Sequence, residues 1–229
     1  MITDFASPNI DARPSGVPID MLVLHYTGME SASAALARLT DSEAKVSAHY
    51  LVEEDGTIVR LVPESMRAWH AGVAIWRGET GINARSIGIE LVNPGHEFGY
   101  RPFPEAQMAA LIELAGDIVG RHPIPARNVV AHSDVAPRRK MDPGELFDWR
   151  RLAAAGVGLW PVEGEAALVG SDGSDSIAAL LTEIGYETDD LFATLKAFQR
   201  HFRPSRVNGR LDLETARLLT GLADLCRRP

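Results

Sequence analysis

The chain has 229 residues, a formal net charge of −8 at pH 7, and a composition of 45% hydrophobic and 24% charged residues. These values are typical of a globular protein whose length accommodates one sizeable core and a small second domain. The acidic balance disfavours a nucleic-acid-binding protein, which would need a basic face, and no apolar run approaches the ~18 residues of a transmembrane helix.

Residues 1–16 lack the basic stretch followed by an apolar stretch that marks a secretory signal. We therefore expect a cytoplasmic protein, with a periplasmic or envelope location left open for a chain whose signal has been removed. The single cysteine, Cys226, allows no internal disulfide, which is compatible with a reducing compartment.

The first two thirds of the chain alternates between strand-like and helix-like patterns. Strands are predicted at short apolar or β-prone runs, at 21–26, 46–52, 57–62, 86–92 and 128–131. The pair Asp55-Gly56 between the second and third runs is typical of a hairpin turn. Helices are predicted at 33–39, 105–121 and 148–154, and the second has its apolar residues on one stripe. This alternation predicts an α/β layer fold.

The remainder of the chain changes character. Residues 157–175 are rich in Gly, Pro and Ser and lose periodicity, which predicts a linker. Three helical patterns follow at 177–184, 191–202 and 213–222, with Gly185 ending the first and Asp212 as N-cap of the third. We therefore predict a domain at 1–156, a linker at 157–175 and a three-helix domain at 176–229.

Three residues could hold a catalytic metal. His25 and His132 each lie at the end of a predicted strand, where the sites of sheet-based enzymes gather. Asp142 follows ten residues after His132. Two imidazoles and one carboxylate leave a fourth position for water, as in catalytic zinc sites. Spacing alone leaves open the alternative of partly buried, hydrogen-bonded histidines.

Two charged side chains could act beside such a metal. Glu90 lies within an otherwise apolar strand, where burial would raise its pKa and suit it to proton transfer, whereas an edge position would leave it on the surface. Lys140, two residues before Asp142, could face a developing oxyanion. The alternative is a solvated basic loop formed with Arg138 and Arg139.

The sequence also contains a second possible metal motif. His132 and Asp134 form a His-x-Asp pair that, with His201, could make a facial triad for non-haem iron. Such a site needs a strand-rich barrel around it. Residues 135–201 predict loops, a linker and helices instead, so an iron site is disfavoured.

Several segments resemble, in order, the AmpD/AmiD family of zinc N-acetylmuramoyl-L-alanine amidases, which are of the amidase-2 type and related to peptidoglycan-recognition proteins. The similar segments are LHYTG at 24–28, VSAHYLVEEDGTIVRLVPE at 46–64, RAWHAG at 67–72, SIGIEL at 86–91 and VVAHSDVAPRRKMDPGELFDW at 129–149. In the tail, AFQRHFRPSRVNG at 197–209 and LDLETARLL at 211–219 resemble a three-helix peptidoglycan-binding module, a layout similar to the AmiD branch.

The resemblance implies a central mixed β-sheet flanked by helices, with Zn²⁺ bound by His25, His132 and Asp142. It implies that Glu90 and Lys140 form the catalytic pair. The reaction implied is hydrolysis of the amide between the lactyl group of N-acetylmuramic acid, or its 1,6-anhydro form, and L-alanine of the stem peptide. The expected partners are peptidoglycan fragments (muropeptides) or murein.

Other residues in the similar segments have open roles. His70 could contact substrate or be a packed, hydrogen-bonded histidine, and Asn83 could contact sugar or peptide or cap a turn. Trp69 is predicted to lie in the core, and His49 to be a structural, hydrogen-bonded histidine. Gly81 stands where the family has a sugar-contacting arginine, so the preference between muramyl forms is left open.

Several functions fit these motifs. A recycling amidase would act on soluble anhydro-muropeptides, whereas an envelope amidase would use the tail module to anchor on intact sacculi. A non-catalytic peptidoglycan binder is the alternative from another class, and the intact set of five metal and catalytic residues argues against it. A zinc peptidase that cuts within the stem peptide also stays open.

Overall fold

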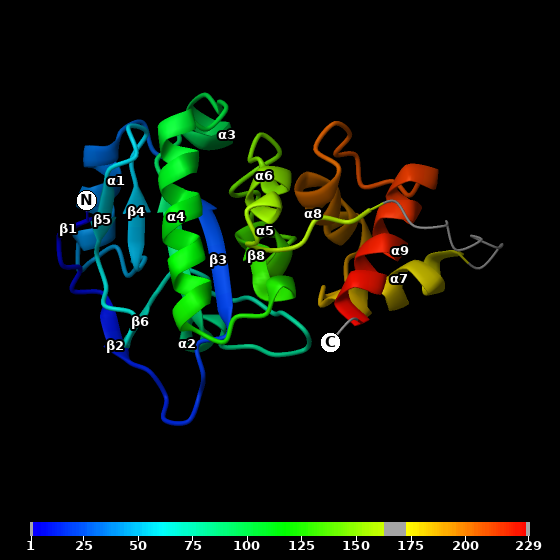
Figure 1. Cartoon of the computed structure of the whole chain (residues 1–229), viewed down its shortest axis with the longest axis horizontal. Coiled ribbons are helices and arrows are strands. Elements are labelled where there is room, and N and C mark those ends of the chain that lie inside the picture. Colours follow the sequence, from blue (N-terminus) through cyan, green and yellow to red (C-terminus); the bar gives the residue numbers. More distant parts are fainter. Residues whose placement is uncertain (1, 163–172, 228–229) are drawn as a thin grey trace.

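Six strands form a mixed β-sheet in the order β1-β5-β4-β7-β3-β8 (Figure 1). The computed structural model describes residues 2–162 and 173–227. Strands β4 and β5 pair antiparallel, and the other neighbours are parallel. The strands are β1 (Ile2–Asp4), β3 (Met21–Tyr26), β4 (Tyr50–Val52), β5 (Ile58–Arg60), β7 (Ser86–Leu91) and β8 (Val129–Ala131). The predicted α/β fold with a mixed central sheet is confirmed.

The long central strands β3 and β7 are buried because both carry apolar side chains on both faces. Alternate side chains of β3 point to opposite sides of the sheet. One set joins a core beneath helix α4 (Glu105–Arg121), and the other joins a core shared with the C-terminal helices. Parallel pairing brings His25 beside Glu90 near the ends of both strands. Ligand sites of α/β sheets lie at this end of the strands.

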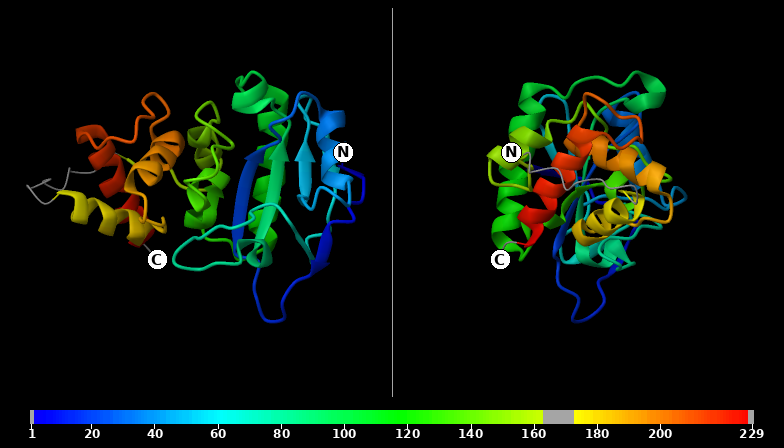
Figure 2. Two further views of the ribbon diagram at one scale, coloured as in Figure 1. Left: turned by 180° about the vertical axis from the view of Figure 1, so that it is seen from behind. Right: turned by 90° about the vertical axis from the view of Figure 1, so that its right-hand side faces the viewer.

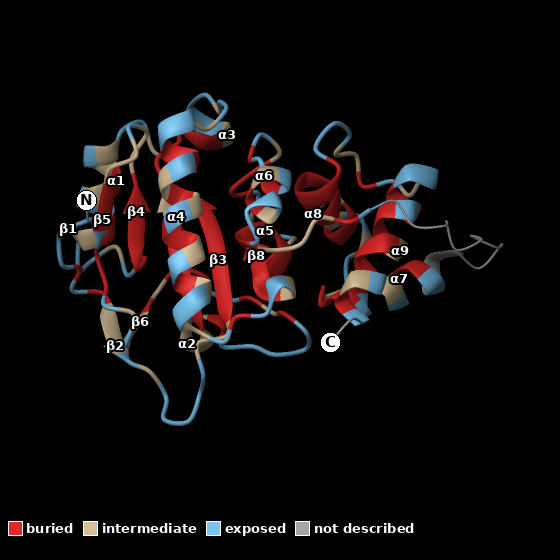
Figure 3. Cartoon of the chain, in the orientation of Figure 1, coloured by how far each residue is buried: buried red, intermediate tan, exposed pale blue. Residues whose placement is uncertain are grey.

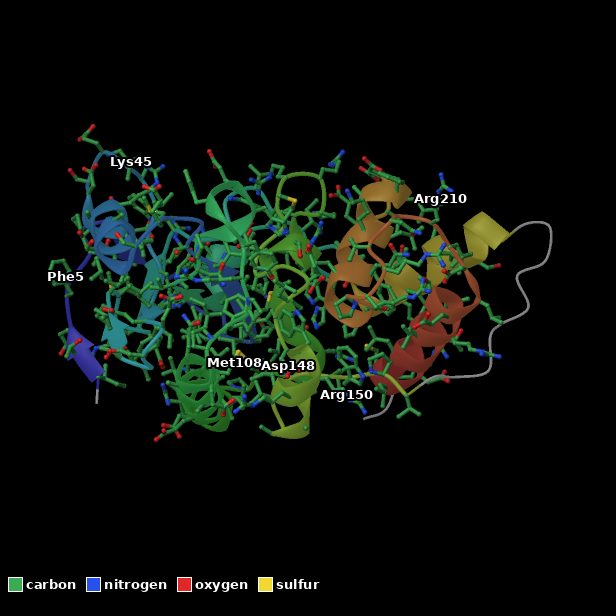
Figure 4. All side chains as sticks on the ribbon, turned by 90° about the horizontal axis from the view of Figure 1, so that it is seen from above. Phe5, Lys45, Met108, Asp148, Arg150 and Arg210 are labelled. Atoms are coloured by element: carbon green, nitrogen blue, oxygen red, sulfur yellow. The ribbon has the colours of Figure 1, made fainter. Side chains whose placement is uncertain are left out.

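Helix α4 covers one face of the sheet with the apolar stripe predicted from its sequence (Figures 1 and 3). Figure 4 labels one member of this stripe, Met108, whose side chain is 2% exposed. Helix α1 (Ala32–Thr40) packs on a smaller cluster with β4 and β5. The short helices are α2 (Ile82–Arg85), α3 (Gly95–Phe98), α5 (His132–Val135), α6 (Trp149–Ala154) and the 3₁₀ turn Ala126–Asn128.

A two-stranded antiparallel sheet of β2 (Ile10–Ala12) and β6 (Met66–Ala68) lies below the main sheet in the view of Figure 1. The sequence patterns predict neither these strands nor β1. Each has three residues that are mostly exposed or half-buried. Because such short, exposed strands need no apolar alternation, their sequences carry no strand pattern.

Three helices follow beyond the β8 edge of the sheet: α7 (Gly173–Ile184), α8 (Leu191–Phe202) and α9 (Leu213–Arg227) (Figures 1 and 2). Their ends match the expected caps. Gly185 has a φ of +139° after α7, and the Asp212 side chain accepts a hydrogen bond from Thr215 N at 3.0 Å in the first turn of α9. Helix α8 is buried throughout its second half (Figure 3).

The predicted linker at 157–175 falls partly on residues 163–172, which lie outside the described residues. Before them, Val157 is 2% exposed and packs in the core beneath α4, and Trp160 packs against both large cores. After them, α7 begins at Gly173, within the predicted linker. The division into a domain, a linker and a three-helix domain stays a prediction.

The helices of the described residues are short relative to a lipid bilayer. None of them is both long enough and apolar enough to cross a membrane. The longest, α4, has 17 residues with an exposed polar face.

Candidate active site

Three side chains converge at the carboxyl ends of the central strands. His25 is the next-to-last residue of β3. His132 is the first residue of α5, directly after β8, and Asp142 lies in the loop that follows α5. The two Nδ1 atoms are 2.9 Å apart, and each lies 3.0 Å from Asp142 Oδ2. All three residues are buried. Within the described part of the chain, this trio alone brings three possible metal-binding atoms so close together, and the alternative iron triad is not assembled.

The other ring nitrogen of each histidine fixes which nitrogen carries the proton. His132 Nε2 lies 3.0 Å from the carbonyl oxygen of Ala71, so it must carry the hydrogen and donate it. Its Nδ1 is then an acceptor when the ring is neutral. This arrangement, in which one nitrogen donates to a fixed acceptor, orients a metal-binding histidine.

A chain of hydrogen bonds does the same for His25. Ser86 Oγ donates to the Ile82 carbonyl at 2.7 Å, so it accepts from His70 Nε2 at 3.0 Å. His70 Nδ1 is therefore an acceptor, and His25 Nε2–H donates a hydrogen bond to it at 3.1 Å. The Nδ1 atom of His25 is left with its lone pair facing His132 and Asp142.

The electrostatic surroundings favour the protonation states that bind a cation. Burial, with the neighbouring charge of His132, lowers the pKa of His25 to about 4. Burial alone would raise the pKa of Asp142, but His132 and His25, when protonated, hold this pKa well below its ordinary value through their charge and their hydrogen bonds to the carboxylate. His25 is thus neutral and Asp142 ionised at neutral pH, as metal ligands must be.

These observations test whether the trio fits a metal ion. When both imidazoles are neutral, two nitrogen lone pairs and a carboxylate oxygen face one another, and none of these three atoms carries a hydrogen to donate to the others. A cation satisfies all of them at once. Tetrahedral zinc with bonds of about 2.0–2.1 Å separates its ligand atoms by roughly 3.3 Å, close to the observed 2.9–3.0 Å. The donor set therefore fits a divalent metal with an open coordination position.

Beside the trio lies a cleft of about 370 Å³. Glu90 and Lys140 both line it, and Glu90 Oε2 is buried without a hydrogen-bond partner among the described residues. Burial and the nearby charge of Asp142 raise the pKa of Glu90 well above its ordinary value, and Lys140 opposes this rise. The cleft extends from the trio to α1 and is lined by Tyr26, Thr27, Gly28, Met29, Ala35, Arg38, Leu39, Val46, Ser47, Trp69, His70, Glu90, His132, Arg139, Lys140, Met141 and Asp142.

The residues with open roles occupy definite places. His70 is 9% exposed and touches the cleft, but both of its nitrogens are engaged with His25 and Ser86. Asn83 is absent from the described cleft lining, and its Oδ1 accepts the backbone N–H groups of His70 and Ala71 at 3.1 and 2.8 Å. It thereby fixes the Ala71 carbonyl that orients His132.

Two further predictions had different outcomes. His49 is fully buried and its Nδ1 accepts the Gly88 N–H at 3.0 Å, so its structural role is confirmed. Trp69, predicted as core, is half-buried and lines the cleft, while its Nε1 donates to Asp11 at 3.3 Å. Sequence reasoning missed Ser86 and the Ala71 carbonyl as supports of the trio, because neither follows from residue spacing.

Replacing Gly88 by Ala is expected to displace His70. A Cβ atom at Gly88 would lie 2.5–2.7 Å from three atoms of the His70 ring, so the ring must move and release His25 Nε2. We expect divalent-metal affinity to fall about tenfold, as for other partners of metal-binding histidines, with a loss of about 1–3 kcal/mol in stability from overpacking. Isothermal titration with Zn²⁺ measures the first effect and urea unfolding the second.

The matched control is Gly116→Ala on α4, where a Cβ meets no atom within 4 Å. This change is expected to leave metal affinity unchanged and to stabilise the helix by up to ~1 kcal/mol. Equal metal affinity in the Gly88 and Gly116 variants would contradict the role given to His70.

Comparison with known proteins agrees with this geometry. Residues 15–145 match the model of the Amidase_2 family, N-acetylmuramoyl-L-alanine amidase. The chain belongs to this family. It is 41% identical to N-acetylmuramoyl-L-alanine amidase AmiD of Escherichia coli K12 over 90% of this chain and 83% of that protein. It is 35% identical to 1,6-anhydro-N-acetylmuramyl-L-alanine amidase AmpD of Enterobacter cloacae over 65% of this chain and 86% of that protein.

A solved structure extends the likeness across both parts of the chain. The E. coli AmiD amidase in complex with anhydro-N-acetylmuramic acid-L-Ala-D-γ-Glu-L-Lys matches with a TM-score of 0.83 and 40% identity. The match covers 94% of this chain and 93% of that chain, so it includes the C-terminal helices as well as the sheet. Membership of the amidase family thus rests on sequence and on the three-dimensional arrangement.

Proposed function

We propose that the protein is a zinc-dependent amidase that cleaves the bond between the lactyl group of N-acetylmuramic acid, or its 1,6-anhydro form, and L-alanine of the stem peptide. The observation that carries the proposal is the convergence of three lone pairs, from His25, His132 and Asp142, beside a cleft that Glu90 also lines. Within the described residues, Glu90 Oε2 has no hydrogen-bond partner. Family membership supports the choice of bond.

In this proposal His25, His132 and Asp142 hold Zn²⁺, which would supply Lewis-acid chemistry for amide hydrolysis. Glu90 Oε2 accepts a proton from the attacking water and delivers it to the nitrogen of L-alanine as the C–N bond breaks. The water oxygen remains on the lactyl carbon, which becomes a carboxylate. Lys140 Nζ stabilises the negative charge that develops on the lactyl carbonyl oxygen.

The environment of Glu90 supports its role as the proton carrier. Its buried Oε2 has no hydrogen-bond partner among the described residues, and its raised pKa makes the carboxylate a stronger base. The charge of Lys140 offsets part of that rise. We assign His70 and Asn83 to positioning of the two histidine ligands; substrate contact by either residue stays a prediction from the sequence.

The substrate is proposed to be a muropeptide or murein. The anhydro-muropeptide in the similar E. coli amidase structure supports a fragment of that size. We also propose that residues 176–229 form a peptidoglycan-binding-like domain. The cytoplasmic location remains the expectation stated from the sequence.

Mass spectrometry of reaction products tests the proposed function. Purified protein loaded with Zn²⁺ is incubated with anhydro-muropeptides and, separately, with intact sacculi. We expect free stem peptides beginning at L-alanine and the matching sugar acid, with no release when a chelator removes the metal. Products cut within the stem peptide would indicate a peptidase, and intact lactyl-alanine linkages in both substrates would refute the amidase. A comparison of the two substrates separates recycling from wall cleavage.

A further inference from the structure

Two consecutive residues of α8, Arg200 and His201, are buried although both can carry charge, and both contact the part of the chain that carries the sheet (residues 2–156, called the sheet domain below). They are 6% and 4% exposed. Neither belongs to the cleft or takes part in the proposed reaction. Their partners lie in the two segments that carry His132 and Asp142, so the contact between the C-terminal helices and the sheet domain reaches the metal trio.

His201 binds the helix that begins with His132. His201 Nδ1 donates to Asp134 Oδ2 at 2.6 Å, and Tyr186 Oη donates to Asp134 Oδ1 at 2.7 Å. Asp134 is 1% exposed, and its Oδ2 also accepts the Ala131 N–H at 2.8 Å. One buried carboxylate therefore ties the C-terminal helices to the backbone N–H of Ala131, the residue before His132.

Aromatic packing fixes the direction of the His201 ring. The ring lies between Trp149, at a centroid distance of 3.7 Å, and Phe202, at 3.8 Å. Trp149 belongs to α6 of the sheet domain. The two stacked rings hold the imidazole in the orientation in which its Nδ1 faces Asp134.

Arg200 reaches the segment that follows Asp142. Arg200 Nε lies 3.4 Å from Glu145 Oε2. Both oxygens of Glu145 also lie 3.2 Å from His96 Nε2, and His96 Nδ1 is 2.9 Å from the hydroxyl of Tyr26. Tyr26 is the neighbour of His25 in β3. The contacts of α8 thus extend toward all three ligand-bearing segments.

We propose that the C-terminal helices are a structural part of the metal centre, with Tyr186 and His201 as positioning residues for His132. This inference rests on the proposed zinc site. Without the two donors, Asp134 would be a buried carboxylate short of partners, which is costly. The carboxylate would then turn toward water, release the Ala131 N–H and loosen the start of α5. A domain that served only as a wall anchor would not need this contact.

The test uses the full-length protein with three substitutions and one control. His201→Phe keeps the stacked ring but removes the donor, and Tyr186→Phe removes only the hydroxyl. His201→Asn restores an N–H group near the position of Nδ1. The control, Leu219→Ala, loosens the buried core of α9, where Leu219 is fully buried, without touching a polar group of α5.

Zn²⁺ dissociation constants are measured by competition with a chromophoric chelator, and the absorption spectrum of the Co²⁺-loaded protein reports the ligand geometry. We expect His201→Phe and Tyr186→Phe to weaken Zn²⁺ binding about tenfold and to alter the Co²⁺ spectrum. A tenfold loss is at the lower end of the range for mutation of residues that support metal ligands through hydrogen bonds. His201→Asn should recover most of the affinity. Leu219→Ala should lower the melting temperature while leaving both metal readouts unchanged.

Wild-type metal affinity in both Phe variants would overturn the inference, as would an equal loss in Leu219→Ala, which would show only general destabilisation. Absence of Zn²⁺ binding in the wild type would instead refute the zinc site on which the inference rests. If the wild type binds Zn²⁺ but releases no stem peptide, the amidase proposal fails while the positioning role is still measured.

Discussion

Replacement of Glu90 by Gln is expected to lower kcat by a factor of about 10² to 10⁴, the range for loss of a positioned proton carrier, with Zn²⁺ content unchanged. The amide keeps the size of the side chain but cannot accept the proton of the attacking water. Glu90 is outside the three-atom cluster, so the metal keeps all of its ligands. Steady-state kinetics with an anhydro-muropeptide and metal analysis of the same sample measure both effects.

The pH dependence distinguishes loss of a base from general damage. A base must be ionised, so wild-type kcat/KM should fall as pH decreases through the pKa of Glu90. Burial and Asp142 raise this pKa, whereas Lys140 and a bound cation lower it. The residual activity of the Glu90→Gln variant should lack this acidic limb. Glu113→Gln on the exposed side of α4 is the control and should keep wild-type kinetics. Wild-type kcat in the Glu90→Gln variant would remove Glu90 from the mechanism.

The elements predicted most accurately are those whose pattern depends on burial. The helix predicted at 105–121 has those same bounds in the structure, because one stripe of side chains packs on the sheet. The strands that carry His25 and Glu90 are also where their apolar runs predict. By contrast, β1 and β2 pair through backbone groups, and their side chains are exposed or half-buried. Their sequences therefore show no apolar pattern that would predict a strand.

The candidate site, too, can be predicted only in part from the sequence. His25 and His132 can be chosen from the sequence because strand ends gather at one edge of the sheet, but spacing cannot separate a metal site from packed histidines. What separates them is the proton on each Nε2, fixed by Ser86 through His70 and by the Ala71 carbonyl. Backbone carbonyls carry no sequence signature, so these contacts appear only in the folded chain.

The contact through Asp134 cannot be predicted from the sequence for a related reason. His132-Ser133-Asp134 has the form of a metal motif, with His201 as a possible third ligand. The structure does bring Asp134 and His201 together, at 2.6 Å, but as a buried hydrogen-bonded pair between α5 and α8. The pairing joins residues 67 positions apart, and it depends on how the C-terminal helices pack.

Replacement of Asp142 by Asn is expected to weaken Zn²⁺ binding more than about 100-fold. Loss of a residue that only hydrogen-bonds to a metal ligand already lowers metal affinity 10- to 100-fold. Asp142 is itself a proposed ligand and the only anionic member of the trio. The Asn side chain has nearly the same shape, but its amide group can donate a hydrogen bond to one Nδ1 lone pair. The three atoms would then no longer all be acceptors, and a cation would have to displace that bond.

Thermal unfolding with and without Zn²⁺ measures this loss directly. At a free Zn²⁺ concentration 1,000 times the dissociation constant, binding adds ~4 kcal/mol to wild-type stability. A 100-fold weaker site loses about 2.7 kcal/mol of that gain, which corresponds to roughly 5–10 °C in melting temperature for a chain of this size. Asp117→Asn on the exposed side of α4 should retain the full wild-type gain. If the Asp142→Asn protein gained as much from Zn²⁺ as the wild type, Asp142 would not be a ligand.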